Sequence, residues 1–187
     1  MKKIGINLVR DKIREVKNSW RFAQLEKLIT KEGDRWSGTL EGLPALAIRH
    51  PRGKHWEGWV QIPSYHRYHS KRMSVCTKLP QCLPTTVAYL KPPNNEIFEC
   101  DHRLGVFLKE IDPAKLPHGG IVGAGEIKSA EGWWWAMDCG HTDDFSPGLL
   151  KLPGIKKMEL PPYRDLKFAQ GELAKLARLI KELGAHA

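Results

Sequence analysis

The stretch Gly132-Trp-Trp-Trp-Ala-Met-Asp-Cys-Gly-His-Thr-Asp-Asp-Phe-Ser-Pro147 begins as an apolar run and ends as a dense polar cluster. Side chains alternate between the two faces of a strand. A strand over the apolar run therefore places Trp133, Trp135 and Met137 together on one face. Asp138 leaves the strand on the opposite face, so this stretch predicts a buried strand that delivers a carboxylate to its end.

The turn after this strand carries His141, Asp143 and Asp144. A rigid element that holds acidic and imidazole side chains in a loop is a common basis for binding and catalytic sites. The alternative is a solvated acidic turn in which Asp138 accepts a hydrogen bond from a backbone amide. The spacing alone leaves both interpretations open, and it does not name a ligand.

Upstream, residues 42–49 and 56–63 have the pattern of two strands joined by the turn His50-Pro-Arg-Gly53, and a hairpin is the expected outcome. Residues 64–71 follow directly and are aromatic, basic and rich in histidine. Stacking and positive charge in such a loop suit an anion. A polar surface loop has the same composition, so this segment leaves two interpretations open.

After residue 71, prolines interrupt the pattern, and we predict short strands at residues 85–90 and across residues 96–108, the second one bulged at Gly105. This part also contains metal-ligating side chains. They lack the close Cys-x-x-Cys pair of a strong zinc signature, so structural zinc is a minor hypothesis here. The side chains concerned are Cys76, Cys82, Cys100 and His102.

Residues 117–125 contain the motif His118-Gly-Gly120. Paired glycines let the backbone approach a ligand closely or adopt a positive φ. The spacing is not that of a nucleotide-binding glycine fingerprint, and no helical pattern follows. By itself the motif is a weak signal for a binding site.

Both ends of the chain have helical spacing. Residues 1–33 form a basic amphipathic segment, either one helix or two helices broken near Asn18-Ser19. We expect its apolar stripe to pack on the core, with partner binding as the alternative. The final helix is predicted from residue 166, with a strongly apolar face and Gly184 as its end. The stripe of the first segment begins with Ile13, Val16, Trp20 and Ala23, and it continues with Leu25, Leu28 and Ile29 before Gly33.

The length of 187 residues suits one compact domain with a proper core, and 41% hydrophobic with 27% charged residues is typical of a soluble globular protein. No apolar run approaches the length of a membrane span, and the lysine-rich N-terminus lacks the apolar core of a signal peptide. We therefore expect a cytoplasmic protein without a membrane partner. The four cysteines show no tight pairing, which indicates reduced thiols.

These elements predict an α+β fold in which a curved antiparallel sheet is packed by the C-terminal helix, with the N-terminal helical segment at one side. Residues 34–187 form the single α+β domain, and residues 1–33 form the basic helical segment. The formal net charge of +9 favours an anionic partner such as a nucleotide, a nucleic acid or an acidic protein surface. The order of the strands is left open.

Several motifs follow one another along the chain: residues 58–63, His66, His118-Gly-Gly120, residues 134–144 and the Tyr163-Arg-Asp165 lead into the last helix. In this order they resemble a family of small uncharacterised bacteriophage and prophage proteins. The resemblance covers about residues 35–183, and residues 134–144 are its most specific part. It implies a phage-type accessory protein in the host cytoplasm, and it implies no established reaction. The recurrent polar positions of the family match His66, His118, Asp138, His141 and Asp144.

The chain departs from the pattern of this family at several positions. Val122 and Gly123 follow the glycine motif, where the family usually has a hydroxyl residue and an aromatic residue. Arg67 stands where a proline is usual, and Asp143 stands where a glycine is usual. The cysteine-containing stretch before the glycine motif is also longer. These changes leave the five recurrent polar positions intact.

The first functional hypothesis is a small-molecule site that acts by catalysis or by sequestration. Imidazoles and carboxylates from separate segments suit a divalent metal that activates water, and they equally suit metal-free acid–base chemistry. The predicted catalytic residues are His118, Asp138, His141 and Asp144, of which the first three are the predicted metal ligands. A small anionic, nucleotide-like ligand would be bound by His66, Arg67, Tyr68, Lys71, Trp134, Gly119 and Gly120.

The second hypothesis is an inhibitor that binds a host protein or nucleic acid in an anti-defence role without chemistry. The charge of +9 and the basic N-terminal segment favour it, and it predicts binding that weakens steeply with salt. The third is a structural network, because buried His and Asp side chains commonly form hydrogen bonds that pin loops. The sequence leaves open whether the protein is an enzyme.

Overall fold

The computed structural model describes residues 2–70, 112–128, 130–151, 155 and 160–184. Within this part, no helix combines the length and the apolar character that crossing a bilayer requires. Some predictions fall outside the described residues, namely Lys71, the zinc hypothesis for Cys76, Cys82, Cys100 and His102, and the strands between residues 85 and 108.

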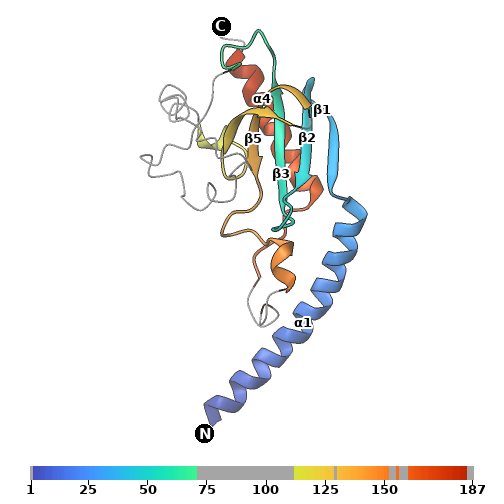
Figure 1. Ribbon diagram of the computed structural model, residues 1–187. Coiled ribbons are helices and arrows are strands. Elements are labelled where there is room, and N and C mark those ends of the chain that lie inside the picture. Colours follow the sequence, from blue (N-terminus) through green and yellow to red (C-terminus); the bar gives the residue numbers. More distant parts are fainter. Residues whose placement is uncertain (1, 71–111, 129, 152–154, 156–159, 185–187) are drawn as a thin grey trace.

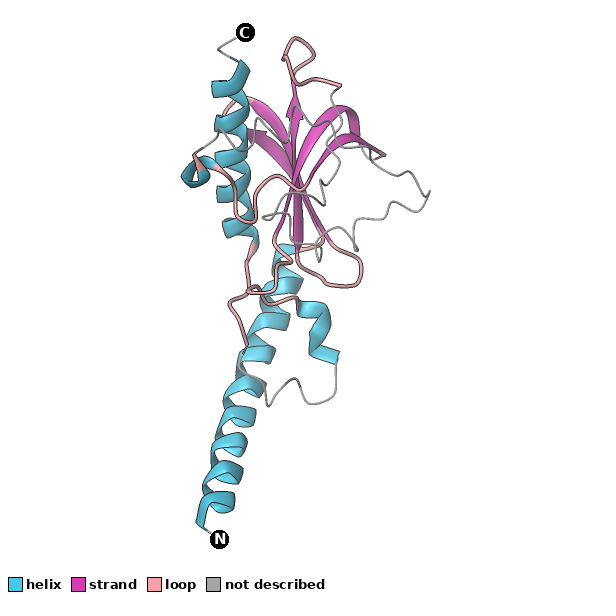
Figure 2. Cartoon of the chain, turned by 90° about the vertical axis from the view of Figure 1, so that its left-hand side faces the viewer, coloured by secondary structure: helices cyan, strands magenta, loops and turns pink. Residues whose placement is uncertain are grey.

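Five antiparallel strands form an open sheet in the order β1-β2-β3-β5-β4 (Figures 1 and 2). Helix α1 (Lys2–Glu32) precedes the sheet, and helix α4 (Leu166–Gly184) packs against β3, β2 and β1. This arrangement confirms the predicted α+β fold. The strands are β1 (Arg35–Leu40), β2 (Leu43–Arg49), β3 (Trp56–Ile62), β4 (Gly123–Ile127) and β5 (Ala130–Asp138).

The predicted alternation along β5 is confirmed, because Trp133, Trp135 and Met137 are all buried in the main core. Helix α4 contributes the other side of this core and buries Leu173 completely. A Cβ atom at Gly58 of β3 would lie 2.8 Å from the Leu173 side chain. The missing side chain at Gly58 therefore lets α4 approach the middle of the sheet closely.

The predicted hairpin is confirmed as β2 and β3, and its turn is closed by a 2.9 Å hydrogen bond from the His50 amide to the His55 carbonyl. Strand β4 was not predicted, since its residues fall partly within the segment interpreted as a glycine motif. Gly123 and Gly125 carry no side chain to pack on a sheet, and glycine is depleted in strands for that reason. Pairing with β5 nevertheless holds this segment as an edge strand.

Helix α1 is continuous, so there is no break near Asn18-Ser19. The Ser19 hydroxyl donates to a carbonyl one turn earlier and stays within the helix. The assignment of the apolar stripe to the core is wrong for Ile13, Val16 and Trp20, because their side chains are mostly exposed. It is confirmed for Leu25, which is buried.

The face of α1 that contacts the body lies opposite Ile13, Val16 and Trp20. Phe22 and Leu25 pack with Phe145 and Ile155 in a second apolar cluster. The N-terminal part of α1 extends away from the sheet (Figure 1). The sequence of α1 therefore contains two apolar faces, and only the one with Phe22 and Leu25 is buried.

The carboxylate of Glu32 fixes the C-terminal end of α1 to the body. It accepts hydrogen bonds from Arg49 Nη2 at 2.5 Å, from Tyr163 Oη at 2.8 Å and from the Leu166 backbone amide at 2.8 Å. The amide of Leu166 opens α4, where backbone N–H groups lack partners within the helix. One acidic side chain therefore joins α1, β2 and the beginning of α4.

Candidate functional site

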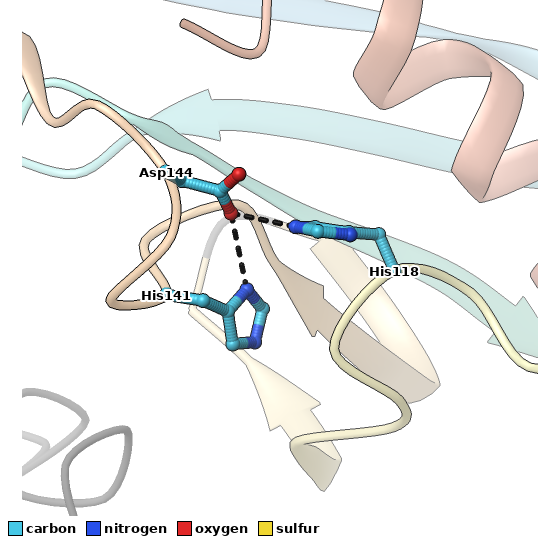
Figure 3. A group of neighbouring side chains, drawn as sticks. All are labelled: His118, His141 and Asp144. Carbon is cyan, nitrogen blue, oxygen red and sulfur yellow. Dashed lines mark hydrogen bonds and ion pairs between the residues drawn. The ribbon is translucent and has the colours of Figure 1, made fainter. Parts of the chain in front are cut away.

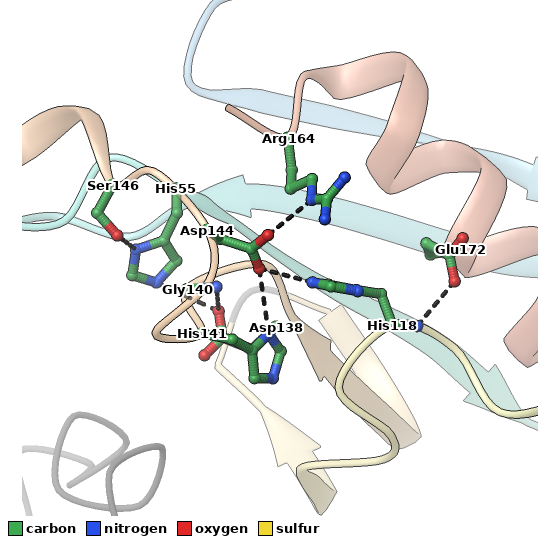
Figure 4. Close-up of polar contacts among 9 residues, drawn as sticks. All are labelled: His55, His118, Asp138, Gly140, His141, Asp144, Ser146, Arg164 and Glu172. Carbon is green, nitrogen blue, oxygen red and sulfur yellow. Dashed lines mark hydrogen bonds and ion pairs between the residues drawn. The ribbon is translucent and has the colours of Figure 1, made fainter. Parts of the chain in front are cut away.

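The carboxylate of Asp144 is the centre of a polar cluster that joins the nearby His141 to His118 and Arg164 from two distant segments (Figures 3 and 4). Its Oδ2 atom lies 2.6 Å from His118 Nε2 and 3.3 Å from His141 Nδ1. Its Oδ1 atom accepts a 2.6 Å hydrogen bond from Arg164 Nε. The Asp144 side chain is fully buried, and protein groups provide hydrogen-bond partners for both of its oxygens.

The charge of Asp144 is set by its partners. Burial alone would raise the pKa of this carboxyl, but hydrogen bonds from Arg164 and His118 outweigh burial and hold the pKa below its usual value. Asp144 is therefore a carboxylate at neutral pH. A buried carboxylate held in place by a guanidinium is a suitable acceptor for imidazole N–H groups or for a metal ion.

A short turn presents His141 and Asp144 together. Strand β5 ends at Asp138, whose Oδ1 accepts a 2.7 Å hydrogen bond from the Gly140 amide. The Asp144 amide then donates to the His141 carbonyl at 3.0 Å, which closes the turn. Phe145 follows and stacks on Phe22 of α1. The predicted hydrogen bond from a backbone amide to Asp138 is confirmed. This turn also carries the His/Asp cluster, so the two interpretations of the segment are compatible.

His118 reaches the cluster from the segment after the 3-10 helix η1 (Pro113–Lys115). Its backbone amide donates a 2.7 Å hydrogen bond to the buried carboxylate of Glu172 on α4 (Figure 4). Its ring packs edge-on against Phe168, also on α4. Helix α4 therefore fixes both the backbone and the ring plane of His118.

Gly119 explains the glycine motif. It has a φ of +71°, and a Cβ atom there would lie 1.8 Å from His141 Nε2. No side chain fits between this backbone and the imidazole. The group that lies close to the Gly119 backbone is therefore the His141 ring and not a ligand. The Nε2 atom of His141 is buried and has no hydrogen-bond partner among the described residues.

A second group of polar contacts braces the same turn. His55 Nε2 lies 3.3 Å from Asp138 Oδ1, and His55 Nδ1 lies 3.2 Å from Ser146 Oγ (Figure 4). Burial lowers the pKa of His55, although the charge of Asp138 opposes this shift. His50 stacks on the His55 ring with 4.8 Å between ring centroids. The turn of the β2–β3 hairpin is in this way tied to both ends of the segment that carries His141 and Asp144.

Glu57 lies beside this group and faces the charge of Asp138, its register partner across β3 and β5. Burial, with the nearby Asp138 charge as a smaller cause, raises the pKa of Glu57 to about 7. The folded protein therefore retains a proton on Glu57 that the unfolded chain releases at lower pH. This favours folding at mildly acidic pH, and the contribution is lost as the pH rises through about 7.

Glu57→Gln is accordingly expected to leave stability near pH 4.5 unchanged and to raise the free energy of unfolding at pH 8. The gain has an upper bound of about 3.5 kcal/mol, since one pKa unit corresponds to about 1.4 kcal/mol. Urea unfolding of both proteins across this range measures it. Glu126→Gln, at an exposed position of β4, is the matched control and should change stability by less than about 0.5 kcal/mol at pH 8. Parallel pH profiles for Glu57→Gln and wild type would show that Glu57 ionises normally.

The other predicted ligand-binding residues that the structure describes lie away from this cluster, and His66, Arg67 and Tyr68 lie next to one another. His66 is buried and its Nε2 atom lies 2.9 Å from the Ile180 carbonyl, near the end of α4. Tyr68 packs against Trp135, with the Arg67 guanidinium over its ring. Trp134 lies on the other face of β5. The structure thus brings His118, Gly119, His141 and Asp144 together, with Gly120 beside them. It places Asp138, His66, Arg67, Tyr68 and Trp134 outside this group.

One group of described residues has the composition and spacing to hold a metal ion. Ligand atoms of His118, His141 and Asp144 all lie within 4.8 Å of one another. Asp138, which was predicted as a ligand, is replaced in this set by Asp144 and is paired with His55 instead. Two imidazoles and one carboxylate suit zinc or another divalent transition metal and leave coordination positions for water or a ligand.

Sequence reasoning missed Arg164, Glu172 and His55. Glu172 had a detectable signal, as an acidic residue beside the apolar face of the last helix. Arg164 lies in the Tyr163-Arg-Asp165 motif, but no role was assigned to it, and the local pattern around His55 indicates no partner far along the chain. No protein-family model, curated protein or solved structure matches this chain.

Proposed function

We propose that this chain is a phage-type accessory protein whose His118–His141–Asp144 site binds a divalent transition metal and, through it, a small anionic ligand of nucleotide type. The observation that carries the proposal is the convergence of three metal-ligating atoms within 4.8 Å from two separate segments. The order of sequence motifs supports the phage assignment. Sequestration and metal-assisted hydrolysis of the ligand are the two roles that this site chemistry supports.

The donor set fits a metal ion in several respects. Arg164 holds Asp144 Oδ1 and leaves Oδ2 directed at the two imidazoles. Such support by a neighbouring hydrogen bond is typical of ligating carboxylates. A metal bound by three protein groups keeps open positions, where it polarises an oxygen of the ligand or activates water.

The anionic character of the ligand follows from charge. The chain carries a net charge of +9, and a bound divalent ion adds positive charge to the site. Phosphate oxygens are good ligands for such an ion, which favours a nucleotide over a neutral metabolite.

A thermal-shift titration tests the proposal directly. We expect Zn²⁺, Co²⁺, Ni²⁺ or Mn²⁺ to stabilise the protein, by about 2.7 kcal/mol at one hundred times the dissociation constant. His118→Ala and His141→Ala should each abolish this shift. His69→Ala is the matched control, since His69 contacts Ser70 and Trp133 outside the cluster, and it should retain the shift.

Nucleotides, including cyclic ones, are then added with and without the metal. Stabilisation that requires the metal supports the proposed ligand class, and product analysis separates hydrolysis from sequestration. If folded His118→Ala responds to metals as the wild type does, the site assignment is wrong. If both histidine variants fail to fold and the wild type ignores every metal, the cluster pins loops and has no binding role.

A further inference from the structure

Three of the largest exposed apolar side chains lie on one face of α1. Ile13, Val16 and Trp20 are 52%, 69% and 70% exposed. Their spacing of three and then four residues aligns them along a helix. The opposite face already packs on the body through Phe22 and Leu25. Folding of the described part of the chain therefore leaves these three side chains exposed, and their exposure needs a separate explanation.

The spacing is that of a coiled-coil seam. With Ile13 and Trp20 at position a of a heptad, Val16 takes position d. Branched apolar residues at these positions are the usual knobs of helix-to-helix packing. Helix α1 is 31 residues long and extends from the body, so a second helix has room to lie along it (Figures 1 and 2).

The charges beside the seam indicate the partner. Positions g and e on either side of Val16 are Lys12 and Lys17, both exposed, and the next such positions are the uncharged Ser19 and Gln24. In a parallel pair of copies, Lys12 of one helix would face Lys17 of the other, which is repulsive. Glutamates at those positions of a different helix would be attracted by both lysines.

We infer that α1 is a docking seam for an acidic amphipathic helix of a partner protein. A lipid surface is less suitable, because the stripe is only as wide as positions a and d and has a lysine on each side. A nucleic acid is less suitable, because apolar side chains occupy the centre of the surface and phosphates need charge there. The inference concerns α1 alone and does not depend on the proposed metal site.

Two synthetic helices of four heptads test this inference with the full chain. Both have Ile at a and Leu at d; one has Glu at every e and g position, and the other has Lys there. Fluorescence anisotropy of the labelled peptides should show the Glu peptide binding at least tenfold more tightly than the Lys peptide. The Trp20 emission should shift to shorter wavelength on binding, because the indole leaves water.

Two sets of variants assign the binding to the seam. The double substitution Ile13→Ser with Val16→Ser should weaken binding of the Glu peptide at least tenfold and leave the melting temperature unchanged, because both side chains are exposed. Leu149→Ser, an equivalent change at an exposed site outside α1, should bind as wild type. The double substitution Lys12→Glu with Lys17→Glu should reverse the preference between the two peptides.

Other outcomes overturn the inference. If both peptides bind equally, or if neither binds, the partner is not an acidic helix. Sedimentation that shows a dimer of the chain alone, lost in the serine variant, makes a second copy the occupant. The chain could instead prefer phosphatidylcholine vesicles with 30% phosphatidylserine to the Glu peptide, and lose this binding in the serine variant; the partner would then be a lipid surface. The same result with a 20-base-pair DNA duplex would identify a nucleic acid.

Discussion

Asp144→Ala is expected to lower the free energy of unfolding by about 3–5 kcal/mol at neutral pH and to abolish metal binding. The substitution removes the single carboxylate shared by His118, His141 and Arg164. Breaking a buried ion pair by removing one partner has this magnitude, because the other groups lose their acceptor without regaining water. Chemical unfolding at pH 7 measures the loss of stability, and metal titration measures the loss of the site.

The pH dependence gives this prediction a second readout. The pKa of Asp144 is lower in the folded state than its ordinary value. Its carboxylate therefore stabilises the fold above the ordinary pKa, and the contribution is lost as the pH falls through the folded-state pKa. The difference between Asp144→Ala and wild type should shrink in acid. Asp143→Ala, one residue away and exposed, should stay within about 0.5 kcal/mol of wild type at pH 7. Equal losses in both variants would remove Asp144 from the centre of the cluster.

Gly119→Ala is expected to have the second largest effect, with a loss of about 2–4 kcal/mol. One part is the strain of a non-glycine residue at positive φ, about 1 kcal/mol. The larger part is a collision, since the added methyl group would lie 1.8 Å from His141 Nε2. Relief requires His141 to move, which withdraws its Nδ1 atom from Asp144. Metal affinity should fall together with stability.

Gly120→Ala is the matched control for this collision. Gly120 also has a positive φ, at +83°, but a Cβ atom there meets nothing within 4 Å. We expect only the backbone strain of about 1 kcal/mol, with metal affinity unchanged. Differential scanning calorimetry compares the two variants. If both lose the same stability and Gly119→Ala binds metal normally, His141 does not lie against the Gly119 backbone.

The fold was largely predictable because its main elements have strong local patterns. The alternation of Trp133, Trp135 and Met137 predicted β5, and the apolar face around Leu173 predicted α4. Strand β4 was missed because its pairing comes from β5 and not from its own glycine-rich sequence. The environment of α1 was misassigned because periodicity identifies an apolar face without showing whether anything covers it.

The candidate site was predictable only in part. His118, His141 and Asp144 were selected by residue type and by their place beside turns, and they do converge. Asp138 was selected on the same grounds, yet its partner is His55 on a different hairpin. Arg164 reaches Asp144 across 20 residues, and Glu172 reaches the His118 amide across 54. Contacts over such separations arise from the packing of α4 on the sheet, which local spacing does not encode.

Helix α1 is anchored to the body at two places, through Glu32 at its C-terminal end and through Phe22 and Leu25 in its middle. The seam ends at Trp20, two residues before Phe22, so at 1.5 Å per residue its outer end at Ile13 lies about 14 Å beyond the Phe22 contact. Tyr163, one of the groups that bind Glu32, directly precedes Arg164, which binds Asp144. Phe22 stacks on Phe145, the neighbour of Asp144, so a helix docked on the seam is connected to the His/Asp cluster through both anchors of α1.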